Sequence, residues 1–299
     1  MARNTVLTQP QREQVMAFPH PADARLIARS YLFSEQDREI IQQQDSKSNQ
    51  FAFALHLCVL RYPGRIWQIN EQLPEYLIDL VSEQLALPAS VLDDYQHDYG
   101  IRRSQLYRLR QQFGFHLFND TTKQLLRGWM IPTTLSTDKA IVLMNVLLAK
   151  MRHEQIVIPA LALLEDFLHG IIQDANQQTH QALTSKLSIQ QRETLSLLLA
   201  NRDDTDKSYA YWLQQPAGTT SVNNFLELLN RLTFLQKMNL GVPEDYPVNT
   251  NRLSQLARRC KRLSAWYLRD LRNSTERDAL LVALSLQLQS SLIDQVLTM

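Results

Sequence analysis

Glycine, cysteine and long apolar runs are scarce in this sequence. It has seven glycines in 299 residues, and because tight turns and strand hairpins depend on glycine, their scarcity favours a helical protein. The two cysteines, Cys58 and Cys260, match no metal-binding spacing and fit a reducing, cytosolic compartment best. The longest apolar run, residues 51–60, is far shorter than the ~20 residues of a membrane span. With no signal-peptide core at the N-terminus, we expect a cytoplasmic protein that does not span a membrane.

Motifs for cofactor binding and metal-dependent chemistry are also missing. The sequence contains no Gly-x-Gly-x-x-Gly and no P-loop, so no nucleotide cradle is indicated. His153-Glu154 resembles the start of a zinc-protease helix, but Val157 stands where the second histidine ligand is required. We therefore expect no cofactor and no metal ion.

Two further groups of residues could in principle be catalytic. His56 and Cys58 lie on different faces of an apolar helix, so a role in the core is favoured over a nucleophile and its base. The acidic pairs at residues 93–94 and 203–204 are expected at helix ends or in loops. An enzyme with a metal site assembled from distant carboxylates stays open as an alternative, but we expect no catalytic residue in this chain.

Helix start signals predict an all-α protein with two or more helical modules and helix-turn-helix-like units. Each signal is a Ser or Thr followed three residues later by Gln or Asp, which can cap the first free amides; the pairs are Thr8 with Gln11, Ser34 with Asp37, and Ser188 with Gln191. Pro132 breaks the helical pattern and predicts DNA-binding modules at residues 1–131 and 137–299. The last helix, residues 276–298, lacks a stop signal, which favours a sequence cut at that point.

Positive charge is concentrated in two segments that both read as helices. Residues 99–127 contain six Lys or Arg and one acid, and residues 250–272 contain seven and one, although the whole chain has a net charge of only +1. Such segregation is typical of proteins that bind a polyanion, most often nucleic acid. The alternative is that each run is a solvated helix face.

The first basic helix, predicted over residues 102–113, directs its apolar residues to one face and most of its long polar side chains to another. Its predicted DNA contacts are Arg102, Arg103, Tyr107, Arg108 and Arg110. Gly114 permits a turn into a second helix at residues 121–130, which has the form of a helix-turn-helix.

The second basic helix, predicted over residues 250–269, has Leu253, Leu256, Leu263 and Tyr267 available for the core. Its arginine and lysine side chains are long enough to reach several phosphates from one helix. Its predicted DNA contacts are Arg252, Arg258, Arg259, Lys261 and Arg262. Adenine-edge contacts by Asn251, Gln105 and Gln111 are a weaker expectation.

The segment NQFAFALHLCVLRYPGR, residues 49–65, resembles a signature in the N-terminal region of Tn-three-family replicative transposases, in a DUF4158-type domain. Further segments are similar to the same region in the same order: LTQPQREQVMAFP, LFSEQDREII, YWLQQPAGTTSVNNFLELLNRL, NTNRLSQLARRCKRLSAWYLRDL and DALLVALSLQLQSSLIDQVL. The resemblance covers essentially the whole chain. One departure is that Cys260 and Trp266 stand where small or polar residues are expected.

The resemblance implies recognition of double-stranded DNA at the terminal inverted repeats of a transposon. In that family a separate RNase-H-like domain with three carboxylates and magnesium cuts and joins the strands, so the resemblance implies that this chain recognises DNA and lacks the chemistry. It further implies a bacterial, nucleoid-associated protein that can form a homodimer at full length. The competing class is a helical scaffold for protein–protein interaction, or an inactive remnant.

Overall fold

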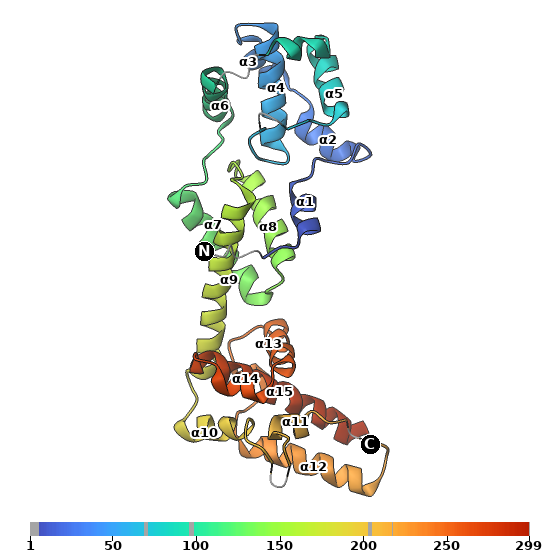
Figure 1. Ribbon diagram of the computed structural model, residues 1–299, viewed down its shortest axis with the longest axis vertical. Helices are drawn as coiled ribbons and strands as arrows, with labels where there is room; N and C mark the ends of the chain where they lie inside the picture. Colours follow the sequence, from blue (N-terminus) through green and yellow to red (C-terminus); the bar gives the residue numbers. More distant parts are fainter. Residues whose placement is uncertain (1–5, 69–70, 96–98, 203–204, 217, 299) are drawn as a thin grey trace. The chain divides into compact units, whose positions relative to one another are not determined.

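The computed structural model describes residues 6–68, 71–95, 99–202, 205–216 and 218–298. In these residues the secondary structure is helical, with three isolated β-bridges and no strand (Figure 1). The described residues divide into two compact units. The first contains the chain up to Met130 together with Lys139–His169, and the second contains Ile131–Asp138 together with the chain from Gly170 onward. The predicted all-α class is confirmed.

The first unit is built around α4 (Lys47–Arg61), in which residues 51–60 are all buried. Helices α2, α3, α5, α6 and the 3₁₀ helix η1 pack around α4, and α1 packs against α8 (Figure 1). Their bounds are α1 (Gln9–Met16), α2 (Ala24–Tyr31), α3 (Glu35–Gln42), α5 (Glu75–Leu85), η1 (Ala89–Asp94), α6 (Tyr99–Phe113) and α8 (Ala140–His153). His56 and Cys58 are buried at the centre of this helix cluster, which confirms their predicted role in the core.

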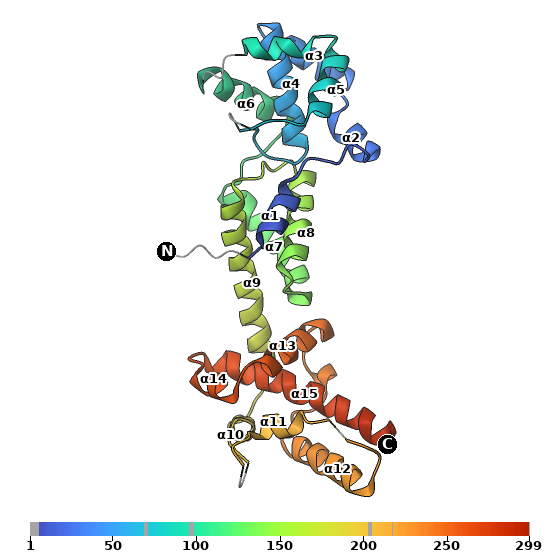
Figure 2. The ribbon, with the colours of Figure 1, turned by 45° about the vertical axis from the view of Figure 1, so that its right-hand side comes forward.

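The second unit is built around α15 (Ser274–Thr298), which packs against α10, α12 and α13 (Figure 2). The other helices are α10 (Ile189–Leu197), α11 (Tyr209–Leu213), α12 (Val222–Lys237), η2 (Pro243–Asp245), α13 (Thr250–Arg262) and α14 (Ala265–Asp270). Helices α7 (Asp120–Ser136) and α9 (Leu161–Thr184) contribute residues to both units.

Helix α15 is long and apolar enough to cross a membrane by length and composition. However, half of its apolar stretch is buried inside the protein, and residues 278–286 are buried without interruption. A core helix of a helical unit has this same composition, so α15 is weak evidence for a membrane span. The sequence did not predict this helix as a candidate, because its apolar residues are interrupted and the longest unbroken apolar run is at residues 51–60.

The predicted helix caps are present. The Ser34 Oγ accepts a hydrogen bond from the Asp37 amide at 3.2 Å, and the Ser188 Oγ accepts one from the Gln191 amide at 3.1 Å. At the first helix, the Thr8 amide donates to Gln11 Oε1 at 3.0 Å. These reciprocal bonds satisfy amides that the first turn leaves without a partner, which confirms the three predicted helix starts.

The predicted break of the helix at Pro132 is wrong. Helix α7 continues through Pro132 to Ser136, and Met130 and Thr134 on either side of the proline are fully buried. Their burial offsets the cost of proline in a helix, which is about 3 kcal/mol. The compact units also differ from the predicted modules, since residues 139–169 belong to the first unit; whether either unit is a DNA-binding module stays a prediction.

The predicted single helix over residues 250–269 is two helices. Leu263 is extended, with φ −91° and ψ 138°, and the Ser264 Oγ then accepts from the Tyr267 amide at 3.1 Å. Because serine is a strong N-cap residue, it starts a new helix at this point. Residues Ala89–Asp94 form the short 3₁₀ helix η1, and residues 96–98 lie outside the described residues.

Candidate nucleic-acid interface

The second unit presents a basic surface on α13 and α14. Helix α13 buries Leu253, Leu256, Ala257 and Cys260 on one side. Since α-helical residues three and four apart share a face, Arg258 and the pair Lys261 and Arg262 lie together on the opposite side, where all three are exposed. We call Arg258, Arg259, Lys261, Arg262 and Arg269 the α13–α14 basic surface.

Most of this positive charge has no carboxylate partner. Arg258 Nε donates only to the Ser254 carbonyl of its own helix, at 3.3 Å. Among the described residues, Lys261 and Arg262 have no carboxylate within ion-pair distance. The exception is Arg259, which pairs with Glu276 at 2.6 Å with 47% of its side chain still exposed. Exposed cations without acidic partners attract phosphate.

A cleft of about 610 Å³ borders the α13–α14 basic surface. Lys261 and Arg269 line it from α13 and α14, and Lys207 and Tyr211 line it from the chain around α11. The Lys207 ammonium lies 4.7 Å from the Tyr211 ring centroid. Trp266 also lines the cleft and is 70% exposed, and one acid, Asp206, offsets part of the charge. The cleft therefore combines cations with exposed aromatic faces, a combination suited to phosphates and bases.

Arg252 is the clearest error among the predicted DNA contacts. Its side chain is 1% exposed and pairs with Asp138 at 3.0 Å, and its guanidinium also donates to Asn176 and Gln255. Burial lowers the pKa of Arg252, and Asp138 opposes that shift. Arg252 precedes the buried Leu256 by one helical turn, so it lies on the core side of α13. It holds the second unit together and is not presented to a ligand.

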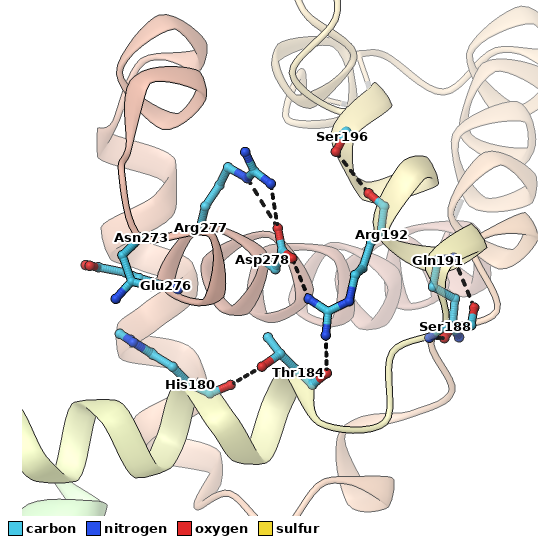
Figure 3. A network of polar contacts seen from close by, with 10 residues as sticks. All are labelled: His180, Thr184, Ser188, Gln191, Arg192, Ser196, Asn273, Glu276, Arg277 and Asp278. Atoms are coloured by element: carbon cyan, nitrogen blue, oxygen red, sulfur yellow. Dashed lines mark hydrogen bonds and ion pairs between the residues drawn. The ribbon is translucent and has the colours of Figure 1, made fainter.

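Other arginines of the second unit are also used internally. Figure 3 shows Asp278 of α15 between two guanidinium groups, with Arg192 at 2.7 Å and Arg277 at 3.2 Å. Arg192 also donates to the Thr184 carbonyl at 2.8 Å. Asp278 is 3% exposed, and a buried carboxylate needs such partners. Burial lowers the pKa of the neighbouring His180, so its imidazole stays neutral at pH 7.

The first unit presents a smaller basic surface on α6. Leu109 is fully buried and Leu106 partly buried against α4, whereas Arg103, Tyr107 and Arg108 are exposed on the outer side. Arg102 is partly buried and donates to the Trp67 carbonyl, and Arg110 is partly buried with its Nε enclosed. The structure therefore places three of the five predicted α6 residues on an open face.

The chain after α6 does not turn directly into the next helix. Gly114 adopts φ +70°, as predicted for a turn. The following residues then pair with the chain after α8: the His116 amide donates to the Gln155 carbonyl at 2.8 Å, and the Val157 amide donates to the His116 carbonyl at 2.8 Å. The helix-turn-helix therefore stays a prediction.

Some residues of the α13–α14 basic surface and its cleft were not predicted from the sequence. Arg269 lies within the basic segment and could have been selected from the charge pattern alone. Lys207 and Tyr211 are about 50 residues away in the sequence, and only the fold of the second unit places them in the cleft. Cys260 and Trp266, the two residues that depart from the family pattern, have opposite environments, since Cys260 is 2% and Trp266 is 70% exposed.

A family model matches the N-terminal part of the chain. The family model described as "Domain of unknown function (DUF4158)" matches residues 6–170, and the chain belongs to this family. The match ends beside His169, the last residue of the first compact unit.

The similar curated proteins are bacterial transposases. The transposase for transposon Tn3926 of Escherichia coli is 29% identical over 99% of this chain and 30% of its own length. The transposases for Tn1546 of Enterococcus faecium and Tn501 of Pseudomonas aeruginosa are each 26% identical, over 97% and 99% of this chain. The resemblance to Tn-three-family transposases is confirmed, and the chain spans about 30% of the length of these relatives. Among the described residues there is no cluster of His, Cys, Asp and Glu that could hold a metal ion.

Proposed function

We propose that the chain binds double-stranded DNA at the ends of a transposon, as the recognition part of a replicative transposase. The observation that carries this proposal is the α13–α14 basic surface, on which Arg258, Lys261 and Arg262 are exposed without acidic partners. Homology to transposases over nearly the whole chain supports the same role.

Most of the affinity comes from phosphate contacts. Each Lys or Arg that neutralises a phosphate releases a condensed counterion, so affinity falls with salt. On α13 the exposed side chains lie one helical turn or less apart, which lets one helix contact several phosphates along a strand. Sequence preference then depends on fewer contacts to base edges, from a neighbouring exposed polar side chain such as Asn251.

Electrophoretic shift assays with a panel of duplexes test this proposal. The panel carries terminal inverted repeats of Tn3926, Tn1546 and Tn501, and each duplex is paired with a scrambled duplex of the same composition. We expect tighter binding to at least one terminal repeat than to its scrambled partner, with affinity falling steeply as salt rises.

Equal binding to every duplex would mean that the chain binds DNA without recognising a terminal repeat, and would overturn the recognition of transposon ends. Absence of binding at low salt would overturn the proposal altogether. In this proposal the chain carries recognition without strand cleavage, so added magnesium should not lead to nicking of a supercoiled plasmid by this chain alone; magnesium-dependent nicking would instead support an assembled metal site.

A further inference from the structure

The Arg61-Tyr62-Pro63-Gly64 turn, at the end of α4, is held by three parts of the first unit. The Tyr31 hydroxyl of α2 donates to the Tyr62 carbonyl at 3.0 Å. Arg152 of α8 donates from Nε to the Pro63 carbonyl at 2.7 Å, and the Ile158 amide donates to the Gly64 carbonyl at 2.8 Å. The turn therefore fixes the ends of α4 and α8 beside α2.

Gly64 is required in this arrangement. It adopts φ +104°, a conformation that side chains rarely allow, and an added Cβ would lie 2.8 Å from Ile158 Cδ1 and 3.2 Å from Arg152 Cγ. The close approach of the turn to α8 places Arg152 beside the end of α4.

A pocket of about 430 Å³ opens beside this turn. Arginines from three helices line it: Arg29 of α2, Arg61 of α4 and Arg152 of α8. His153, Tyr62 and Phe115 add to the wall, and no carboxylate is among the described lining residues. Three guanidinium groups that converge on one pocket leave it strongly positive unless nearby acids neutralise them.

Nearby acids neutralise only part of this charge. Arg61 pairs with Asp37 at 2.8 Å, and the exposed His153 contacts Glu154, which also pairs with Lys150. Arg152 has no carboxylate partner among the described residues; its guanidinium lies 4.4 Å from the Tyr62 ring centroid.

Burial lowers the pKa of Arg152, yet an arginine remains charged in proteins. Arg29 is exposed and makes no ion pair with any described residue. Arg29 and Arg152 therefore both line the pocket with N–H donors that no carboxylate of the described residues occupies.

The position of the pocket links it to the basic helix of the same unit. The Arg61 guanidinium lies 5.6 Å from the ring centroid of Phe113, the last residue of α6. Phe115 lines this pocket and also a second concavity, which contains Arg110 of α6. A phosphodiester strand that contacts the C-terminal end of α6 can therefore also reach the pocket.

We propose that this pocket of Arg29, Arg61 and Arg152 binds a backbone phosphate of DNA. Planar guanidinium groups match phosphate oxygens in geometry and charge. Because the three groups are held by three packed helices, they are preorganised, which lowers the entropy lost on binding. The inference rests on the proposed function and assigns to the first unit a phosphate contact that the basic helices alone do not provide.

Arg29→Gln tests the pocket, with Arg25→Gln as its matched control. Both arginines are exposed on α2, but only Arg29 lines the pocket, so neither change should disturb folding. For DNA binding by the full chain, the salt slope is the slope of log affinity against log salt concentration. We expect Arg29→Gln to reduce the magnitude of this slope by about 0.9, the value for one lost phosphate contact. Arg25→Gln should leave the slope at its wild-type value.

If the wild-type chain binds DNA and Arg29→Gln has the same salt slope, the proposed phosphate contact in the pocket is overturned and the proposed function stays intact. Absence of DNA binding by the wild-type chain would overturn the proposed function itself.

NMR signals of the arginine Nε–H groups distinguish backbone phosphate from a small phosphate ligand. Titration with duplex DNA should shift the Arg29 and Arg152 signals, whereas inorganic phosphate at the same concentration should shift them little. Saturable shifts with inorganic phosphate and none with DNA would assign the pocket to a small phosphate compound and overturn the proposal.

Discussion

Arginines of similar sequence context have very different roles in this protein. Arg252 and Arg262 lie on the same helix, yet Arg252 is buried with Asp138 while Arg262 is exposed. Removing one partner of a buried ion pair leaves an uncompensated polar group, which is strongly destabilising. An exposed arginine without a partner contributes little to stability and is available to a ligand.

Arg252→Ala should therefore reduce stability and leave the DNA salt slope unchanged. We expect a loss of about 3 kcal/mol, at the low end for buried pairs because the Asp138 side chain is 44% exposed. Urea unfolding followed by tryptophan fluorescence measures the loss.

Arg262→Ala is the control for Arg252→Ala, with a stability change within about 0.5 kcal/mol and a reduced salt slope. If Arg252→Ala were stable and reduced the salt slope, Arg252 would be a phosphate contact after all, as its sequence pattern predicted.

The two cysteine thiols give a prediction about pH. Burial raises the pKa of Cys58 and of Cys260 from 9.0 to about 12. In the unfolded chain each thiol ionises at the lower pKa, so its contribution to stability is complete below pH 9 and is lost as pH rises toward 12.

Because only the thiolate reacts, iodoacetamide at pH 8 should modify neither thiol in the folded protein and both in urea. Mass spectrometry of timed samples measures the modification. Equal rates in the two conditions would show that the core around these residues opens readily.

At the scale of elements, the sequence predicted where helices begin more reliably than where they end. Capping residues such as Ser34 and Ser188 act within one turn, so local sequence is sufficient to predict them. The continuation of α7 through Pro132 depends on burial of Met130 and Thr134, and burial depends on distant parts of the chain. Local patterns could not predict it.

The two candidate sites differ in how far the sequence predicts them. The α13–α14 basic surface was largely predictable, because most of its cations belong to one continuous basic segment. Helical phase would also have placed Arg252 on the side of Leu256, and so inside. The pocket at the end of α4 was not predictable, because Arg29, Arg61 and Arg152 come from three helices that only the folded unit brings together.

Helix α13 also provides a test at the element scale. Lys261→Gln removes an exposed charge from the α13–α14 basic surface, and Lys186→Gln removes an exposed lysine that lies on neither α13 nor α14. We expect Lys261→Gln to reduce the DNA salt slope by about 0.9 and Lys186→Gln to leave it unchanged. Equal effects of the two substitutions would mean that only net charge matters and that α13 has no special role.

At the scale of the whole molecule, each compact unit carries its own basic surface, α6 and the pocket in the first and α13–α14 in the second. The two surfaces belong to one chain, so when one is bound the other is held at a high effective concentration near the same duplex. Under the proposed function, loss of one contact is therefore expected to weaken DNA binding without abolishing it. The proposed function would then use both units of one chain to recognise an extended terminal sequence.

A double variant tests whether both units bind the same DNA. Arg29→Gln and Lys261→Gln lie in different compact units, and sites without shared partners contribute additively. The combined variant should therefore reduce the salt slope by about 1.8, twice the effect of one lost phosphate contact. Fluorescence anisotropy with one duplex over a range of salt concentrations measures the slopes for the wild type, the two single variants and the double variant. A combined reduction no larger than that of Lys261→Gln alone would show that the first unit does not contact DNA while the second is bound.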